Sequence, residues 1–187
     1  RYLNQMGCAA NFAFANRALI QLTVEKILKK YGINSEIIYD VGHNLLTIEN
    51  RNNMTVAVHR KGASKALTMG HPDLKGYYEK IGQPIPIGGS MGTASYLLLA
   101  KETEKSNYSC PHGSGRVLSR NEAKRRFSND DVKNSMTNIL LFCKSENGAI
   151  EEHPEVYKDI DLVADAACEL NLTEKIVRLV PIGVIKG

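Results

Sequence analysis

The sequence predicts an α+β fold, with mixed strands and helices in one compact domain. Segments with helical spacing of apolar residues and segments of strand-like composition follow one another without a regular strand–helix–strand alternation. The 187 residues are 43% hydrophobic and 24% charged, which is ordinary globular composition and enough chain for one substantial core. These observations favour α+β over a doubly wound parallel sheet.

A long helix is expected first, over residues 9–31. Phe12, Leu19 and Ile27 recur near helical spacing along it. Gly32 follows directly, and glycine is a common residue just beyond the end of a helix. The spacing and the stop together predict one helix over this segment.

Strands are expected next. Residues 35–41 have strand composition and end in a loop that contains His43. Residues 45–49 and 54–59 predict a strand pair, because the polar segment 50–53 between them is typical of a turn.

The second half of the chain continues the mixture. In chain order it predicts an extended or looped segment at 82–89, a strand at 94–100 and a loop at 109–116. A short helix is expected from the capping-box pair Ser119 and Glu122 to Arg126, followed by a strand at 138–144. The chain then predicts a helix at 159–171, with Ile160, Val163, Ala164 and Ala167 on one face, and one or two strands over 175–185.

Composition limits the classes of function. The apolar runs are too short to span a bilayer, and residues 1–5 lack the layout of a secretory signal. The spacings of Cys8, Cys110, Cys143 and Cys168 match no zinc template, so we expect reduced, mostly structural thiols and a cytoplasmic protein, or a nuclear one in a eukaryote. The chain lacks an initiator Met, which suggests a fragment or a processed product. The net charge of +4 permits an anionic partner without requiring one.

Two glycine-rich segments are candidates for binding a phosphate. In 109–116, His112 precedes Gly113-Ser114-Gly115, whose backbone N–H groups could form an anion-binding nest, and Arg116 could add a contact to a phosphate. The second segment, 88–95, is rich in small and hydroxyl residues and suits close approach to a nucleotide. Taken singly, a ligand-free turn explains each segment slightly better.

Three further positions carry possible chemistry. His43 lies at the end of an expected strand and could ligate a metal, although a lone histidine more often only forms hydrogen bonds. The run His59-Arg60-Lys61-Gly62 could contact an RNA backbone, as could 124–126, or both could be solvated charges. Lys186 could point into a site or remain exposed at the chain end.

Together these segments resemble the RtcB family of RNA-splicing ligases. The matching motifs stand in the family's order along nearly the whole chain: Ala9-Ala10-Asn11-Phe12-Ala13 with Asn16-Arg17, Asp40-Val41 with His43-Asn44, His59-Arg60-Lys61-Gly62-Ala63, Gly89-Ser90-Met91-Gly92-Thr93-Ala94-Ser95-Tyr96, His112-Gly113 with Gly115-Arg116, Tyr157-Lys158-Asp159, and Pro181-Ile182-Gly183-Val184-Ile185-Lys186-Gly187. The resemblance implies that residues 1–187 are the C-terminal half of one RtcB-like catalytic domain.

The resemblance also implies a reaction. GTP and Mn²⁺ are the cofactors, and His112 attacks the α-phosphate of GTP to become guanylylated. The implied substrates are an RNA with a 3′-phosphate or 2′,3′-cyclic phosphate end and an RNA with a 5′-hydroxyl end, as in tRNA splicing or RNA repair. GMP passes to the RNA 3′-phosphate, and the 5′-hydroxyl then attacks and releases GMP. The implied partners are RNA, such as tRNA halves, and an activating protein or a tRNA-ligase complex, with no membrane.

Residue roles follow from the same resemblance. His43 matches a manganese ligand, and Asn44 matches a nucleotide contact. The guanylate-binding residues implied by the family are Gly88, Gly89, Ser90, Met91 and Ser95 in one loop, His112, Gly113, Ser114 and Gly115 beside the nucleophile, Lys186 on the guanine, and Tyr157 over the base.

Three positions depart from the family's pattern. Gly88 stands where proline is usual, Pro111 precedes the nucleophile and restricts Cys110 to extended geometry, and Ser114 stands where alanine is common. The family's other metal ligands, an aspartate, a cysteine and two histidines, belong to an upstream half that this chain lacks. We therefore expect the isolated chain to be incomplete for catalysis.

Two other functions stay open at the level of sequence. A non-catalytic RNA-binding module would need only the basic residues, so loss of His112 would leave it intact. A metal-dependent phosphoesterase would release phosphate without GTP. The combination of the loop at 88–95, the cradle at 112–115 and Lys186 favours the ligase.

Overall fold

The computed structural model describes residues 1–51 and 53–186. The chain divides into two compact units, Arg1–Lys61 and Gly62–Gly187. Each unit contains both helices and strands, so the expected α+β class is confirmed. The assignment of residues 1–187 to one half of a single catalytic domain stays a prediction.

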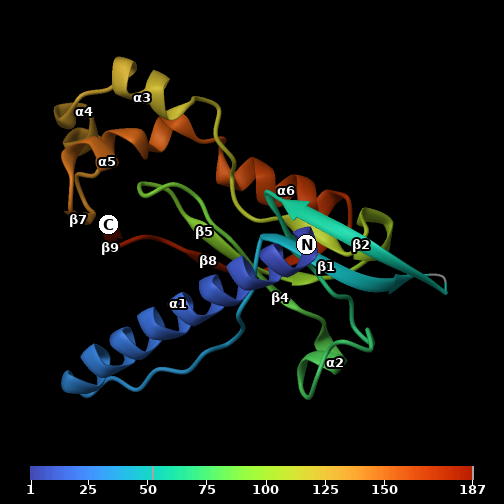
Figure 1. Cartoon of the computed structure of the whole chain (residues 1–187). Helices are drawn as coiled ribbons and strands as arrows, with labels where there is room; N and C mark the ends of the chain where they lie inside the picture. Colours follow the sequence, from blue (N-terminus) through green and yellow to red (C-terminus); the bar gives the residue numbers. More distant parts are fainter. Residues whose placement is uncertain (52, 187) are drawn as a thin grey trace. The chain divides into compact units, whose positions relative to one another are not determined.

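The first unit begins with α1 (Tyr2–Lys30), a continuous helix of 29 residues (Figure 1). It begins at Tyr2, earlier than the expected residue 9. Its stop is as expected: Gly32 follows with φ +72°, a conformation that glycine adopts without strain. No residue of α1 is buried, and Phe12 is 77% exposed. The apolar residues that predicted this helix thus lie within it, but they are not part of a buried core.

The predicted strand pair is confirmed as the antiparallel hairpin of β1 (Asn44–Arg51) and β2 (Met54–Lys61). Asn52 of the predicted turn lies outside the described residues. The strand expected at 35–41 is wrong, because the described residues 33–43 contain no strand. Composition favours an extended backbone there, but a strand also needs a neighbouring strand as a hydrogen-bonding partner, and composition does not supply one.

A charged cluster lies on the hairpin. Arg60 Nη1 donates to Glu49 Oε1 at 2.6 Å, Arg51 Nη2 lies 2.5 Å from Glu49 Oε2, and Thr47 Oγ1 donates to Glu49 at 2.6 Å. The side chains of Arg60 and Glu49 are 3% and 9% exposed. Burial alone would raise the pKa of Glu49, but the hydrogen bonds from Arg60, Thr47 and Arg51 outweigh it and lower the pKa from 4.5 to about 2.

We expect Glu49→Gln to weaken the hairpin by about 2 kcal/mol at neutral pH, because a buried guanidinium loses its charged acceptor. Since the folded-state pKa is depressed, the Glu49 contribution is complete above pH 4.5 and disappears as the pH falls toward 2. Amide hydrogen exchange of β1 and β2 measures both effects. The exposed Glu36→Gln is the matched control. Equal protection in the two variants would contradict the prediction.

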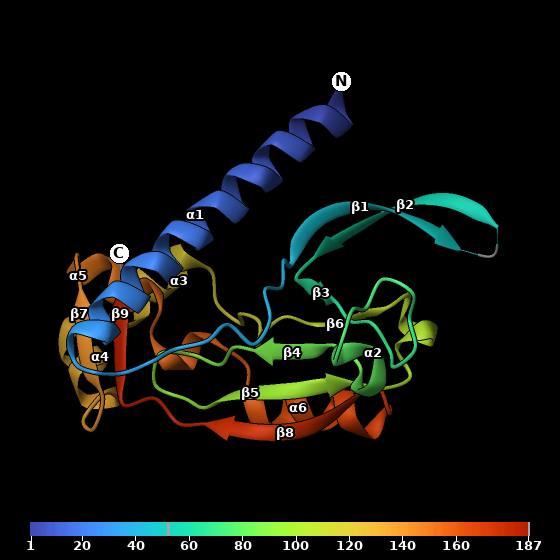
Figure 2. The ribbon, with the colours of Figure 1, turned by 90° about the horizontal axis from the view of Figure 1, so that it is seen from below.

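A three-stranded antiparallel sheet forms the centre of the second unit, with strand order β4 (Pro84–Ile87), β5 (Ser95–Ala100) and β8 (Thr173–Leu179). Figure 2 shows α6 (Ile160–Glu169) behind β5 and β8. The main core joins this helix to the sheet. Its buried residues are Ala66, Ile85, Ile87, Ala94, Tyr96, Leu98, Ala100, Cys110, Ile160 and Ala164. The expected strands at 94–100 and 175–185 and the helix at 159–171 are thus confirmed, although Val163 is only partly buried.

Short elements connect the sheet to the candidate site. β3 (Ala63–Lys65) pairs antiparallel with β6 (Ser109–Pro111), so the loop expected at 109–116 begins as a strand. Three residues are too few for a periodic pattern, which is why the sequence did not reveal it. The remaining short elements here are α2 (Tyr78–Ile81) and the 3₁₀ turn η1 (Thr103–Ser106).

A cluster of short helices and turns, with the two strands β7 and β9, follows β6. It consists of α3 (Arg120–Arg126), α4 (Asn129–Ser135), β7 (Leu140–Cys143), α5 (Glu146–Glu151), the 3₁₀ turn η2 (Pro154–Val156) and the last strand, β9 (Gly183–Lys186). The predicted capping box is confirmed, with both bonds between Ser119 and Glu122 present. A second core of Met91, Val132, Met136 and Ala149 holds the cluster together. β9 pairs parallel with β7, while β8 pairs with β5, so the C-terminal strands belong to two sheets. Gly187 lies outside the described residues.

Candidate nucleotide-binding site

Two loops that are distant in sequence meet at the candidate site. Gly88 follows β4, and His112 follows β6. Gly88 N donates to His112 O at 3.4 Å, and Ser114 N donates to Gly88 O at 2.8 Å. The backbone of the predicted nucleophile is therefore hydrogen-bonded to the start of the predicted guanylate loop.

Glycine is required where these loops touch. A Cβ on Gly113 would lie 2.9 Å from Gly88 O, and a Cβ on Gly89 would lie 1.9 Å from Ala94 O. Both neighbouring atoms belong to the backbone and cannot move aside as a side chain would. The glycines thus permit a close approach of backbone segments, which is the geometry needed to bring N–H groups to an oxyanion.

The loop after Gly89 is a turn braced by its own hydroxyl groups; we call residues 89–95 the Ser90 turn. Ser90 N donates to Thr93 Oγ1 at 2.8 Å, and Gly89 N donates to Ser95 Oγ at 3.2 Å. Gly92 N donates to Ser90 Oγ at 3.3 Å. The side chain of Met91 is buried in the second core, so this residue can offer a ligand only its backbone.

A cavity of about 360 Å³ lies between the Ser90 turn and the C-terminal segment. The turn contributes Gly89, Ser90, Met91, Thr93 and Ser95, and the C-terminal segment contributes Leu179, Val180, Pro181, Val184, Ile185 and Lys186. Its lining combines hydroxyl groups, backbone and one lysine with apolar surface, which is the usual character of a small-molecule site. The structure thus brings together the Ser90 turn and Lys186, which the sequence separates widely.

A network of charged groups holds Lys186. Lys186 Nζ lies 3.2 Å from Glu152 Oε2, and Tyr157 Oη donates to the same oxygen at 2.5 Å. Arg116 Nη1 lies 3.2 Å from Glu152 Oε1 and 3.3 Å from Tyr157 Oη. The guanidinium of Arg116 also lies over the Tyr157 ring, 5.2 Å from its centroid. We refer to these four residues as the Glu152 network.

Burial, hydrogen bonds and charges within the Glu152 network shift the pKa values of two of its members, Glu152 and Tyr157. Burial alone would raise the pKa of Glu152, but hydrogen bonds from Tyr157 and Lys186 and the charges of Lys186 and Arg116 lower it below its usual value. Burial and the bond to Glu152 raise the pKa of Tyr157. At neutral pH the network therefore contains a carboxylate anion and a neutral phenol.

Cys110 is the cysteine nearest in sequence to His112. Burial raises the pKa of its thiol to about 12, so it is not a thiolate at neutral pH. The four cysteines are free thiols; Cys110 is buried and Cys8 is exposed, and their expected structural role stays a prediction.

Ser114 is unusual among the residues of the cradle. Its side chain is 3% exposed, and its Oγ has no hydrogen-bond partner among the described residues. A buried hydroxyl without a partner is costly unless a ligand or water completes it. Together with the glycine contacts, this orphan hydroxyl fits a site that receives a polar ligand.

His43 and Asn44 belong to the first unit. Asn44 begins β1 and pairs with Lys61, and His43 directly precedes it. In the part of the chain that the structure describes, no group of three His, Cys, Asp or Glu side chains is placed to hold a metal ion. One imidazole does not make a manganese site, so these residues alone do not fit that ion.

Sequence reasoning missed Glu152. The only available signal was its position in Glu151-Glu152, five residues before Tyr157, and an acidic pair there is most simply read as solvated surface. The guanidinium of Arg116 also donates to Leu118 O and Glu151 O. Its hydrogen bonds are thus directed at the protein itself, which disfavours the suggested phosphate contact. In the basic run, Lys124 pairs with Glu151.

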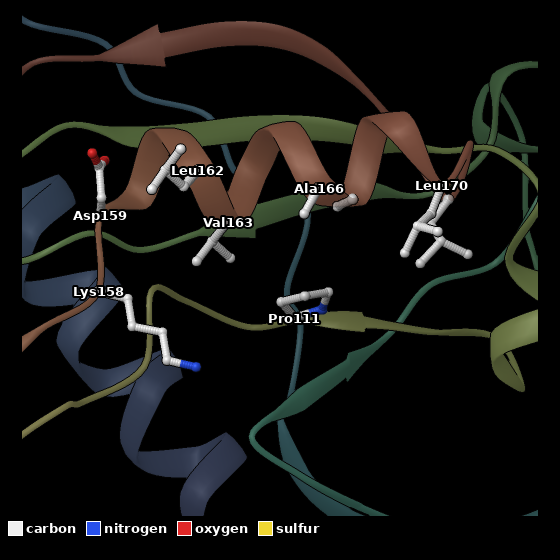
Figure 3. Close-up of a pocket in the computed structure, with 9 residues that line it drawn as sticks. Pro111, Lys158, Asp159, Leu162, Val163, Ala166 and Leu170 are labelled. Atoms are coloured by element: carbon white, nitrogen blue, oxygen red, sulfur yellow. The ribbon is translucent and has the colours of Figure 1, made fainter.

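A second hollow, of about 520 Å³, lies along α6 (Figure 3). Leu162, Val163, Ala166 and Leu170 line it from one side and Pro111 from the other. Its lining is mostly apolar, and Lys158 and Asp159 are the charged residues among those that line it. No helix in the described residues combines the length and apolar character needed to cross a bilayer.

The fold and the cavity beside the Ser90 turn define an α+β protein with a candidate nucleotide pocket. A family model described as "tRNA-splicing ligase RtcB" matches residues 1–187, and the chain belongs to that family. It is 44% identical to the tRNA-splicing ligase RtcB of Nanoarchaeum equitans over 200 residues, which cover all of this chain and 42% of the relative. It is 39% identical to the RNA-splicing ligase RtcB of Mycobacterium bovis and to the tRNA-splicing ligase RtcB of Aeropyrum pernix, covering 45% and 41% of them. The chain thus spans less than half the length of these relatives.

Proposed function

We propose that this chain is the C-terminal half of a GTP- and Mn²⁺-dependent RNA ligase. The proposed enzyme joins RNA 3′-phosphate or 2′,3′-cyclic phosphate ends to 5′-hydroxyl ends in the cytoplasm. One observation carries the proposal: the cavity joins the Ser90 turn to Lys186, and the loop of His112 is hydrogen-bonded to Gly88 at the edge of that turn. Family membership adds independent support.

In the proposed reaction, a neutral ring nitrogen of His112 attacks the α-phosphate of GTP and pyrophosphate leaves. His112 then passes GMP to the RNA 3′-phosphate, and the 5′-hydroxyl of the second RNA displaces GMP. The N–H groups of 113–115 and of the Ser90 turn are suited to hold phosphate oxygens, since glycine keeps side chains away from them.

At the guanine end of the proposed site, Lys186 contacts the base. An ammonium group can donate to O6 and N7 of guanine, both of which are acceptors. Tyr157 lies beside Lys186 through their shared carboxylate, Glu152. The described residues provide only one matched manganese ligand, His43, so they do not hold the ion by themselves.

A chimera tests the proposal. This chain would replace the matching 200-residue segment of the Nanoarchaeum equitans relative. With GTP labelled at the α-phosphate and Mn²⁺, we expect an acid-labile label on the protein, as a histidine phosphoramidate requires, and joining of RNA ends. A folded chimera that takes up no label would refute the proposal.

The isolated 187-residue chain is the second arm of this experiment. We expect it to join no RNA, because His43 alone cannot hold the metal. Joining of a 2′,3′-cyclic phosphate end by the purified chain would contradict this expectation.

A further inference from the structure

We infer that Glu152 is a positioning residue, which holds the Lys186 ammonium beside the Ser90 turn so that it meets the O6 edge of guanine. The inference rests on the proposed function, and it adds a residue that the family motifs of this chain do not include. Glu152 is not offered as a contact to the nucleotide. It acts through the two groups that it binds, Lys186 and Tyr157.

Backbone hydrogen bonds hold both residues of this pair in place. Glu152 is the cap residue of α5, and its N–H donates to Ala149 O; Ala149 itself is buried in the second core. Lys186 ends β9, where it pairs with Cys143 of β7, and its carbonyl accepts from Lys144 N at 3.1 Å. The two side chains therefore meet between fixed anchors.

The Lys186 side chain needs such a restraint. A lysine carries a point charge on a flexible four-carbon stem, and this one is 33% exposed at its side chain. Arg116 lies on the same carboxylate and would repel the ammonium if Glu152 were neutral. An ionised Glu152 thus keeps two cations and one phenol together, and its lowered pKa maintains that charge at neutral pH.

Glu152 also joins three segments of the candidate site. Arg116 ends the loop that carries His112, Tyr157 follows η2, and Lys186 lies on β9. All three donate to the one carboxylate. A solvated surface ion pair would not connect the nucleophile loop to the cavity lining in this way.

The test uses the chimera and the initial rate of protein labelling as a function of nucleotide concentration. Glu152→Gln keeps the shape of the side chain and removes its charge. We expect the KM for GTP to rise about tenfold, as loss of one charge-assisted contact implies, with the maximal labelling rate changed by less than about twofold. Glu151→Gln is the matched control, because Glu151 pairs with Arg120 and Lys124 outside the network; its KM should not change.

A second nucleotide tests whether Glu152 positions Lys186 or only supports the fold. The triphosphate of 2-aminopurine riboside keeps N7 but lacks the O6 acceptor, so it loses the O6 contact to Lys186 that the inference assigns. We expect a raised KM for this analogue in the unsubstituted chimera and little further rise on Glu152→Gln, because the two changes remove the same contact. Glu152→Asp keeps the charge on a shorter side chain and should restore part of the GTP affinity; it also serves if Glu152→Gln fails to fold.

The outcomes are distinct. Equal KM values for Glu152→Gln and Glu151→Gln would overturn the inference and leave the proposed function standing. So would equal losses for GTP and the analogue, which would mean that Glu152 only supports the fold. Absence of any label on the folded, unsubstituted chimera would overturn the proposed function, and the inference with it.

Discussion

His112→Ala in the chimera is expected to abolish both protein labelling and RNA joining. Alanine has no nucleophilic atom, and Cys110, the cysteine nearest in sequence, is protonated at neutral pH and so does not replace the imidazole. The loss should be at least about 1000-fold, as is typical when a covalent nucleophile is removed. Gel detection of the labelled protein and of the joined RNA measures it.

His71→Ala is the control for this prediction. His71 belongs to the same unit, and its ring packs edge-on against Tyr108 with 4.8 Å between centroids. It lies outside the two loops of the candidate site, 88–95 and 109–116. We expect the His71 variant to retain labelling. Undiminished RNA joining by the His112 variant would instead argue that His112 is not the nucleophile.

Gly89→Ala is expected to reduce labelling about 100-fold, the loss that follows when catalytic groups are displaced by about 1 Å. The new Cβ would lie 1.9 Å from Ala94 O and 2.6 Å from Thr93 Oγ1. The Ser90 turn must therefore open, and the bond from Ser90 N to Thr93 Oγ1 is then lost. Labelling rates at saturating GTP measure the effect.

Gly88→Ala is the matched comparison, one residue earlier. A Cβ at Gly88 meets nothing within 4 Å, and Gly88 has no positive φ that alanine would resist. The Gly88 variant should lose far less activity than the Gly89 variant. Comparable losses would mean that flexibility of the loop, rather than the contact with Ala94, explains the requirement for glycine.

Local patterns predicted much of the fold. The β1–β2 hairpin follows from two apolar runs around a polar turn, and the helix that Ser119 caps follows from the spacing of Ser119 and Glu122. Gly32 marked the end of α1 correctly. Each of these signals acts within a few residues, so a single sequence contains it.

The sequence-based predictions fail where a distant segment of the chain decides the structure. Residues 35–41 have strand composition, but no strand forms there. The apolar spacing on α1 predicted a helix correctly, yet it could not show that the helix has no buried residue. Local preference selects a backbone conformation, whereas pairing and burial depend on segments elsewhere in the chain.

The sequence alone determined which residues are predicted to carry the chemistry: a histidine before Gly113, a glycine–hydroxyl loop at 88–95, and a lysine near the end. The tertiary structure decided how they meet. Parallel pairing of β9 with β7 brings Lys186 to Glu152, and the contact of Gly88 with Ser114 joins the two loops. These contacts join residues far apart in the chain, and the free energy that selects them comes from burying the two cores, which no local pattern records.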